Sequence, residues 1–217
     1  MAQQTIIIRP QEHKHLVFVN PHDTAFDVSI ARDAALSMHI VSIDGMTSSN
    51  SVHVTFEDHG SCLDLRGLVL TEGQQELDIS THVDHAFGDC TSRQLFKYML
   101  ADESKASFYG LLHVAQDSQH TDASQTNRNI LLSSSASMRT EPELEIYADD
   151  VKCSHGASTG QLDRTAMFYM QQRCLSREDA QSLLLQAFVA DVIDGLSEEV
   201  RDMVYRQIAK ISENLRL

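Results

Sequence analysis

Apolar and polar residues alternate in short runs along the first 160 residues of the chain. A period of two places one side of a β-strand in a core and the other side in water. The clearest runs are 52–56, 63–65, 68–70, 77–79, 108–114 and 144–146. Turn-forming residues separate them, as at 58–60, 71–73 and 102–104. The pattern predicts many short strands without intervening helices, which is typical of a solenoid, a sandwich or a barrel.

No fixed repeat length stands out among these runs, so periodicity alone leaves the three β architectures open. Residues 94–100 also fit helical spacing, and periodicity does not decide between a helix and a strand for this segment.

The spacing changes after Gly160 to the three- and four-residue steps of amphipathic helices. Asp163, Ser176 and Ser197 are suited to cap three successive helices. We expect the second helix to bury Ala180, Leu183, Leu184, Ala187 and Phe188, and the third to bury Val200, Val204, Ile208, Ile211 and Leu215. The sequence therefore predicts a β domain over residues 1–160 and a small three-helix domain over residues 161–217.

The composition excludes several classes of partner. The 217 residues include 31 Asp and Glu against 17 Lys and Arg, for a formal net charge of −14. Such a surface repels nucleic-acid phosphates and anionic lipids. No run approaches the ~20 apolar residues of a membrane span. The four cysteines are widely spaced, which favours reduced thiols. We expect a cytoplasmic protein that binds neither nucleic acid nor membrane.

Common catalytic motifs are missing: the sequence has no P-loop, no G-x-S-x-G and no H-E-x-x-H. Its most distinctive feature is a long ordered string of polar residues over 143–157. Shorter strings precede it at 84–85, 90–93 and 121–132, and others follow at 160–163, 168–169 and 179–180.

These strings, in this order and at this spacing, resemble the SufB/SufD family of the SUF iron–sulfur cluster assembly system. The resemblance covers roughly residues 50–195. The segment Cys153-Ser154-His155-Gly156 resembles the SufD branch, because the SufB branch tends to have Cys-Glu-His-Glu there.

The resemblance implies a right-handed parallel β-helix followed by a small C-terminal helical domain. It also implies a scaffold or assembly subunit without catalysis of its own, which supports Fe–S cluster assembly and iron acquisition. Such a subunit pairs with a SufB-like subunit and binds a SufC-like ABC ATPase through its C-terminal helices. The cluster is held transiently in the complex, so we expect none tightly bound to the isolated chain. Two departures stand out: family members are about twice as long, and Cys174 occupies a position where glycine is expected.

Cys153 and His155 are the candidate metal-binding residues. They lie two apart in a predicted strand and therefore point to the same side. Thiolate and imidazole both bind iron or zinc, although an isolated cysteine is more often a small core residue. The resemblance places His155 at the heterodimer interface, opposite a cysteine of the SufB-like subunit, as a ligand of the nascent cluster. Cys153 is the weaker candidate.

Free strand edges near residues 143–151 predict that the isolated chain forms a homodimer, because an uncovered edge tends to pair with another chain.

An alternative function is a β-solenoid hydrolase or lyase that uses Asp84 and His85. His82, Asp84 and His85 resemble the end of an H-x-H-x-D-H metal box, but Ser80 stands where its first histidine would be. Asp84, Asp89 and Arg93 also invite comparison with β-helix polysaccharide lyases. The absence of tryptophan from the chain weakens the interpretation as a sugar-binding enzyme.

Overall fold

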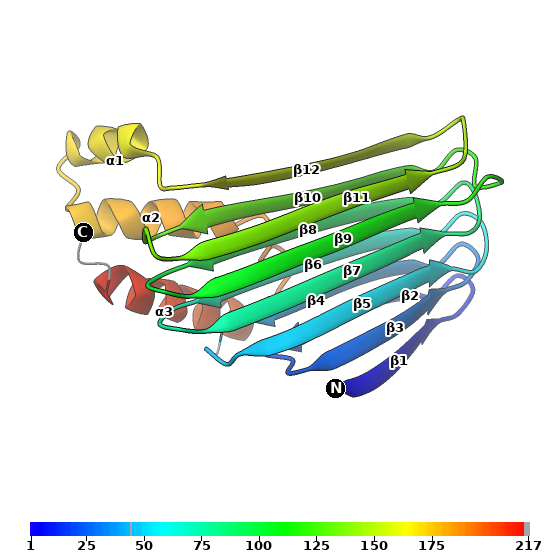
Figure 1. Cartoon of the computed structure of the whole chain (residues 1–217), viewed down its shortest axis with the longest axis horizontal. Helices are drawn as coiled ribbons and strands as arrows, with labels where there is room; N and C mark the ends of the chain where they lie inside the picture. Colours follow the sequence, from blue (N-terminus) through cyan, green and yellow to red (C-terminus); the bar gives the residue numbers. More distant parts are fainter. Residues whose placement is uncertain (44, 215–217) are drawn as a thin grey trace.

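Two parallel six-stranded sheets form the body of the protein in this computed structural model, which describes residues 1–43 and 45–214 (Figure 1). Sheet A contains, in spatial order, β1 (Ala2–Ile8), β3 (Thr24–Ile30), β5 (Ser48–Phe56), β7 (Glu76–His85), β9 (Lys105–Val114) and β11 (Ser137–Ile146). Sheet B contains β2 (His13–Val19), β4 (Ala35–Ser42), β6 (Cys62–Thr71), β8 (Thr91–Leu100), β10 (Asp122–Leu131) and β12 (Lys152–Gly160). Consecutive strands alternate between the sheets, so the chain winds as a solenoid. The predicted mainly β solenoid with C-terminal helices is confirmed.

The repeat was not visible in the sequence because its length changes along the chain. Paired residues on neighbouring strands are 22 positions apart at His15 and Ser37, but 29 apart at Glu76 and Lys105. The separation is 31 positions at Phe96 and Asn127. Residues 94–100, which also fitted a helix, lie within β8, where pairing with β6 and β10 selects the strand.

The main apolar core lies between the two sheets and contains five fully buried aromatic side chains, those of Phe26, Phe56, Phe96, Tyr98 and Phe108. Gly67 on β6 leaves room for one of these rings, because a Cβ at this position would lie 2.1 Å from Cδ1 of Phe96.

Three helices follow the strands: α1 (Arg164–Gln171), α2 (Arg177–Val189) and α3 (Glu198–Asn214). Asp163 and Ser176 cap α1 and α2 as predicted: the Asp163 side chain accepts hydrogen bonds from two backbone amides of the first turn, and the Ser176 side chain accepts one. A second apolar cluster joins α2 and α3 to the outer face of sheet B, with Leu185 and Ile208 among its helical members and Leu68 and Met99 among those of the sheet. The helices therefore lie at one side of the solenoid (Figure 1).

The predicted buried stripe of α2 is largely wrong. Its buried residues are Ala180, Gln181, Leu185 and Val189, of which only Ala180 was expected, whereas Leu183 is 41% exposed. Three consecutive leucines at 183–185 leave the phase of an amphipathic pattern undetermined, and packing on sheet B selects Leu185. In α3 the expected Val204, Ile208 and Ile211 are buried, and Leu215 lies outside the described residues.

Lys97 on β8 connects the C-terminal end of α2 to sheet B through a hydrogen bond and an ion pair. Its side chain is only 4% exposed, and Nζ donates to the backbone oxygen of Phe188 at 2.6 Å and to Oδ1 of Asp191 at 2.5 Å. The same ammonium lies 4.8 Å from the centre of the Phe188 ring. Nearby, Nη1 of Arg66 donates to the backbone oxygen of Asp191 at 2.8 Å. The end of α2 is thus held in a fixed position over sheet B.

Candidate interface site at the open end of the solenoid

The last two strands leave one end of the solenoid uncovered. Within the described ranges, β11 pairs only with β9, and β12 pairs only with β10, so each has one free edge. Exposed apolar side chains lie at the end of β11: its last residue, Ile146, is 38% exposed, and Tyr147, which follows it, is 61% exposed. Free parallel edges are templates for a strand from another chain.

The two candidate ligands lie at this open end. Cys153 pairs with the buried Ala123, and His155 pairs with the buried Gln125, so both point toward the interior of the solenoid. Cys153 is half-buried against the core, and this burial raises the pKa of its thiol. His155 is exposed, with no hydrogen bond or ion pair to any residue that the structure describes.

The interior becomes polar toward this end. One row of paired, inward-facing residues crosses sheet B: Leu16, Met38, Leu65, Gln94, Gln125 and His155. The first three are apolar and the last three polar. A solenoid interior is normally filled by apolar side chains, so three polar residues in register at its open end point to a function there.

Most of the polar segment 121–129 lies in a strand, with alternate side chains inside the solenoid. Residues 122–131 form β10, and its alternate residues Gln125, Asn127 and Asn129 are buried inside the solenoid. Nδ2 of Asn129 donates to Oδ1 of Asn127 at 2.6 Å and to Oγ1 of Thr159 at 3.1 Å. Neither amide atom of Gln125 has a hydrogen-bonding partner within residues 1–43 and 45–214. The period-two spacing of these polar residues was the signal that could have placed them in a strand.

Cys153 and His155 do not form a complete metal site by themselves. Among residues 1–43 and 45–214, no group of three or more His, Cys, Asp or Glu side chains is arranged to hold a metal ion. Because protein-bound iron and zinc are usually held by three or four protein ligands, Cys153 and His155 alone would be an incomplete ligand set.

The alternative site around Asp84 and His85 is not assembled. Adjacent residues of β7 point to opposite faces of sheet A. His85 faces the interior, where it is fully buried and its Nε2 lies 2.8 Å from Oγ of Ser92. Burial lowers the pKa of His85 to about 4. Asp84 lies on the outer face, 2.6 Å from Nδ1 of His113. One substrate could not contact both residues.

Cys174 has an unusual backbone. All four cysteines are free thiols, and Cys174 is exposed between α1 and α2. Its φ of 66° lies in the left-handed region, which favours glycine. The glycine expected from the family resemblance fits this conformation.

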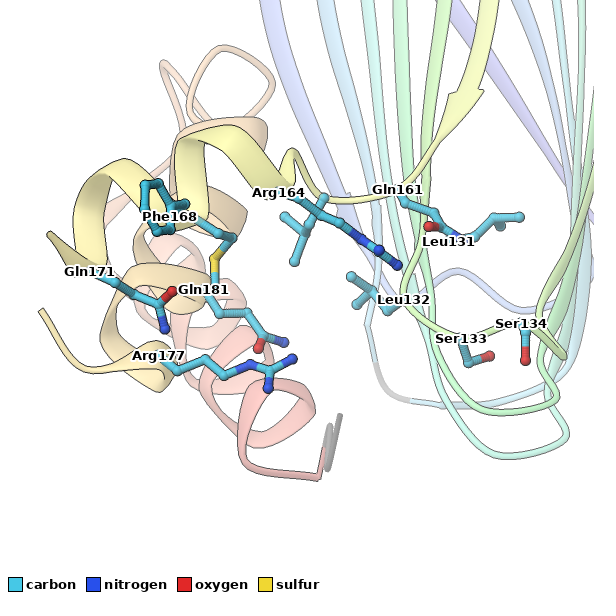
Figure 2. Close-up of a pocket in the computed structure, with 12 residues that line it drawn as sticks. Leu131, Leu132, Ser133, Ser134, Gln161, Arg164, Phe168, Gln171, Arg177 and Gln181 are labelled. Carbon is cyan, nitrogen blue, oxygen red and sulfur yellow. The ribbon is translucent and has the colours of Figure 1, made fainter.

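The first helix presents an apolar surface. No residue of α1 is buried, and Phe168 and Tyr169 are 61% and 57% exposed. A cavity of about 720 Å³ separates α1 from the end of β10, and Figure 2 shows Arg164, Arg177 and Gln181 around it. None of the helices in the described ranges is long and apolar enough to cross a membrane.

Within the described residues, the chain is a parallel β-solenoid followed by three C-terminal helices, and this fold by itself does not define a function. The sequence profile of the family described as "SUF system FeS cluster assembly, SufBD core domain" matches residues 16–188, and the chain belongs to this family.

Curated relatives agree with this assignment. The chain is 35% identical to "Iron-sulfur cluster assembly protein SufD" of Escherichia coli (strain K12) over 207 residues, which is 94% of this chain and 48% of the relative. It is 35% identical to an "Iron-sulfur cluster assembly SufBD family protein" of Synechocystis over 72% of this chain and 34% of the relative. It is also 34% identical to "Protein ABCI7, chloroplastic" of Arabidopsis thaliana over 77% of this chain and 36% of the relative. The chain thus spans half or less of the length of these relatives.

Proposed function

We propose that this chain is the core of a SufD-type scaffold subunit that supports Fe–S cluster assembly and iron acquisition in the cytoplasm without catalysis of its own. It pairs through its open end with a SufB-like subunit. The observation that carries this proposal is the position of Cys153 and His155 beside the free edges of β11 and β12.

The nascent cluster is the cargo of this interface. His155 supplies one ligand from this chain, and the facing subunit supplies the others, including a cysteine. A two-chain site explains why the described residues of this chain hold no complete ligand group. It also explains transient binding, because separation of the subunits removes part of the ligand set. Cys153 has a mainly structural role, since it packs against the core.

The energy for assembly comes from a SufC-like ABC ATPase. This sequence contains no P-loop. The exposed face of α1 around Phe168 and Tyr169, beside the cavity shown in Figure 2, supports docking of the ATPase at the C-terminal helices.

Two matched substitutions test pairing through the open end. Leu144 on β11 and Leu16 on β2 are both partly buried against the core, one at each end of the solenoid. We expect Leu144→Asp to abolish co-purification with a SufB-like subunit, whereas Leu16→Asp should keep it. Similar loss in both variants, or retention in Leu144→Asp, would contradict pairing at this end.

A further inference from the structure

Gln125 is a buried amide without a hydrogen-bonding partner. It is 1% exposed, and both Nε2 and Oε1 lack a partner among the described residues. Buried side-chain amides in native proteins are nearly always hydrogen-bonded, so an exception requires an explanation. The position of Gln125 beside His155, a candidate metal ligand, suggests an explanation.

The backbone makes room for this amide. Gln125 reaches from sheet B across the interior to β9, where a Cβ on Gly110 would lie 2.1 Å from Nε2. The residue paired with Gly110 on β11 is Pro142, which belongs to the last turn. The amide therefore lies one layer below the open end, under the side chains of that turn.

His155 lies directly above Gln125. The two residues are register partners on β12 and β10. Neighbouring strands are about 4.8 Å apart, so the two inward-facing side chains occupy adjacent layers. The structure has no hydrogen bond between them, and a rotation of the exposed imidazole about its side-chain bonds would bring a ring nitrogen to the amide. A neutral imidazole needs an acceptor for its one N–H, and Gln125 offers a free carbonyl oxygen.

We propose that Gln125 is the positioning residue of His155. Its Oε1 accepts the N–H of one ring nitrogen, which fixes the tautomer and leaves the lone pair of the other nitrogen for the metal. Metal-binding histidines commonly have such a second partner, and losing it lowers metal affinity or activity about 10–100-fold. This inference rests on the proposed role of His155 as a ligand of the nascent cluster.

Gln94 provides a matched control. It belongs to the same inward-facing row, one strand further from the open end, and is 2% exposed. Its Oε1 already accepts from Oγ1 of Thr81 at 3.0 Å. Gln94 is not the register partner of β12, so replacing it should not affect the tautomer of His155.

The experiment compares Gln125→Met with Gln94→Met. Imidazole ¹⁵N shifts, assigned with His155→Ala, report the tautomer in the ¹⁵N-histidine-labelled chain. Iron and sulfide are measured after anaerobic reconstitution with SufB-like and SufC-like subunits. We expect Gln125→Met to give mixed tautomers and to lower cluster content about 10-fold with the heterodimer intact. Gln94→Met should change neither readout. If Gln125→Met fails to fold, Gln125→Glu keeps an acceptor at the same position and should leave His155 with a single tautomer.

Different results would contradict the positioning role of Gln125 and the ligand role of His155. Unchanged tautomer populations in Gln125→Met, or an equal change in Gln94→Met, would overturn the positioning role. Mixed tautomers in Gln125→Glu would do the same. Normal cluster content in His155→Ala would instead overturn the ligand role of His155, whichever tautomer the ring adopts.

Discussion

The attachment of the helices to the solenoid depends on the buried ammonium of Lys97. Its partners are the carboxylate of Asp191, which is 53% exposed, and the backbone oxygen of Phe188. Removing either charge breaks the same ion pair, but the groups left behind differ. Asp191→Ala leaves a buried ammonium with one neutral acceptor. Lys97→Met leaves an aspartate that turns toward water.

The difference between the groups left behind determines how much stability each variant is expected to lose. Removing one partner of a buried charge costs up to 3–5 kcal/mol, and a half-exposed Asp191 reduces this to about 2–3 kcal/mol. An apolar replacement of similar shape for a buried charge is often close to neutral, so we expect Lys97→Met to cost below about 1.5 kcal/mol. The double variant should resemble Lys97→Met, because no buried charge remains.

Urea unfolding followed by circular dichroism measures these differences, since the chain has no tryptophan for fluorescence. Salt sensitivity is a second readout, because a buried pair is screened less than a surface pair. A larger loss of stability in Lys97→Met than in Asp191→Ala would refute the reasoning.

Three further predictions concern stability and assembly. Cys174→Gly should stabilise the chain by about 1 kcal/mol, because φ at this position is 66°, and an unchanged urea midpoint would count against backbone strain. Burial lowers the pKa values of His39 and His85 to about 4, so the unfolded chain binds protons more readily than the folded chain. Lowering the pH from 7 to 5 should therefore remove about 2 kcal/mol of stability for each histidine. A urea midpoint that stays constant between pH 7 and pH 5 would contradict this prediction. The isolated chain should be a homodimer in light scattering, with Leu144→Asp shifting it to monomer; a monomeric parent chain at high concentration would contradict edge pairing.

Local patterns were enough to predict much of the fold. Period-two alternation predicted strands, and the capping residues Asp163 and Ser176 predicted the starts of two helices. The phase of α2 was missed, because the run of leucines at 183–185 fits more than one helical face. The buried face depends on contacts with residues such as Met99, which lie far away in the sequence.

The candidate site was also only partly predictable from local sequence patterns. Cys153 and His155 could be placed on one side of a strand from their spacing alone. Gln125 was missed, because its importance depends on pairing with residues about 30 positions away, at Gln94 and His155. A repeat of changing length does not reveal such rows in a single sequence. The failure of Asp84 and His85 to form one site follows from strand alternation once their segment is known to be β7.

The central claim is that the open end of this solenoid completes a cluster site with a second subunit. Its most direct test is the iron and sulfide content of the anaerobically reconstituted complex with SufB-like and SufC-like subunits, compared between His155→Ala and Cys153→Ser. We predict that His155→Ala abolishes cluster assembly while the heterodimer persists, and that Cys153→Ser retains assembly at a stability cost of about 1–2 kcal/mol. Normal cluster content in His155→Ala would contradict the account.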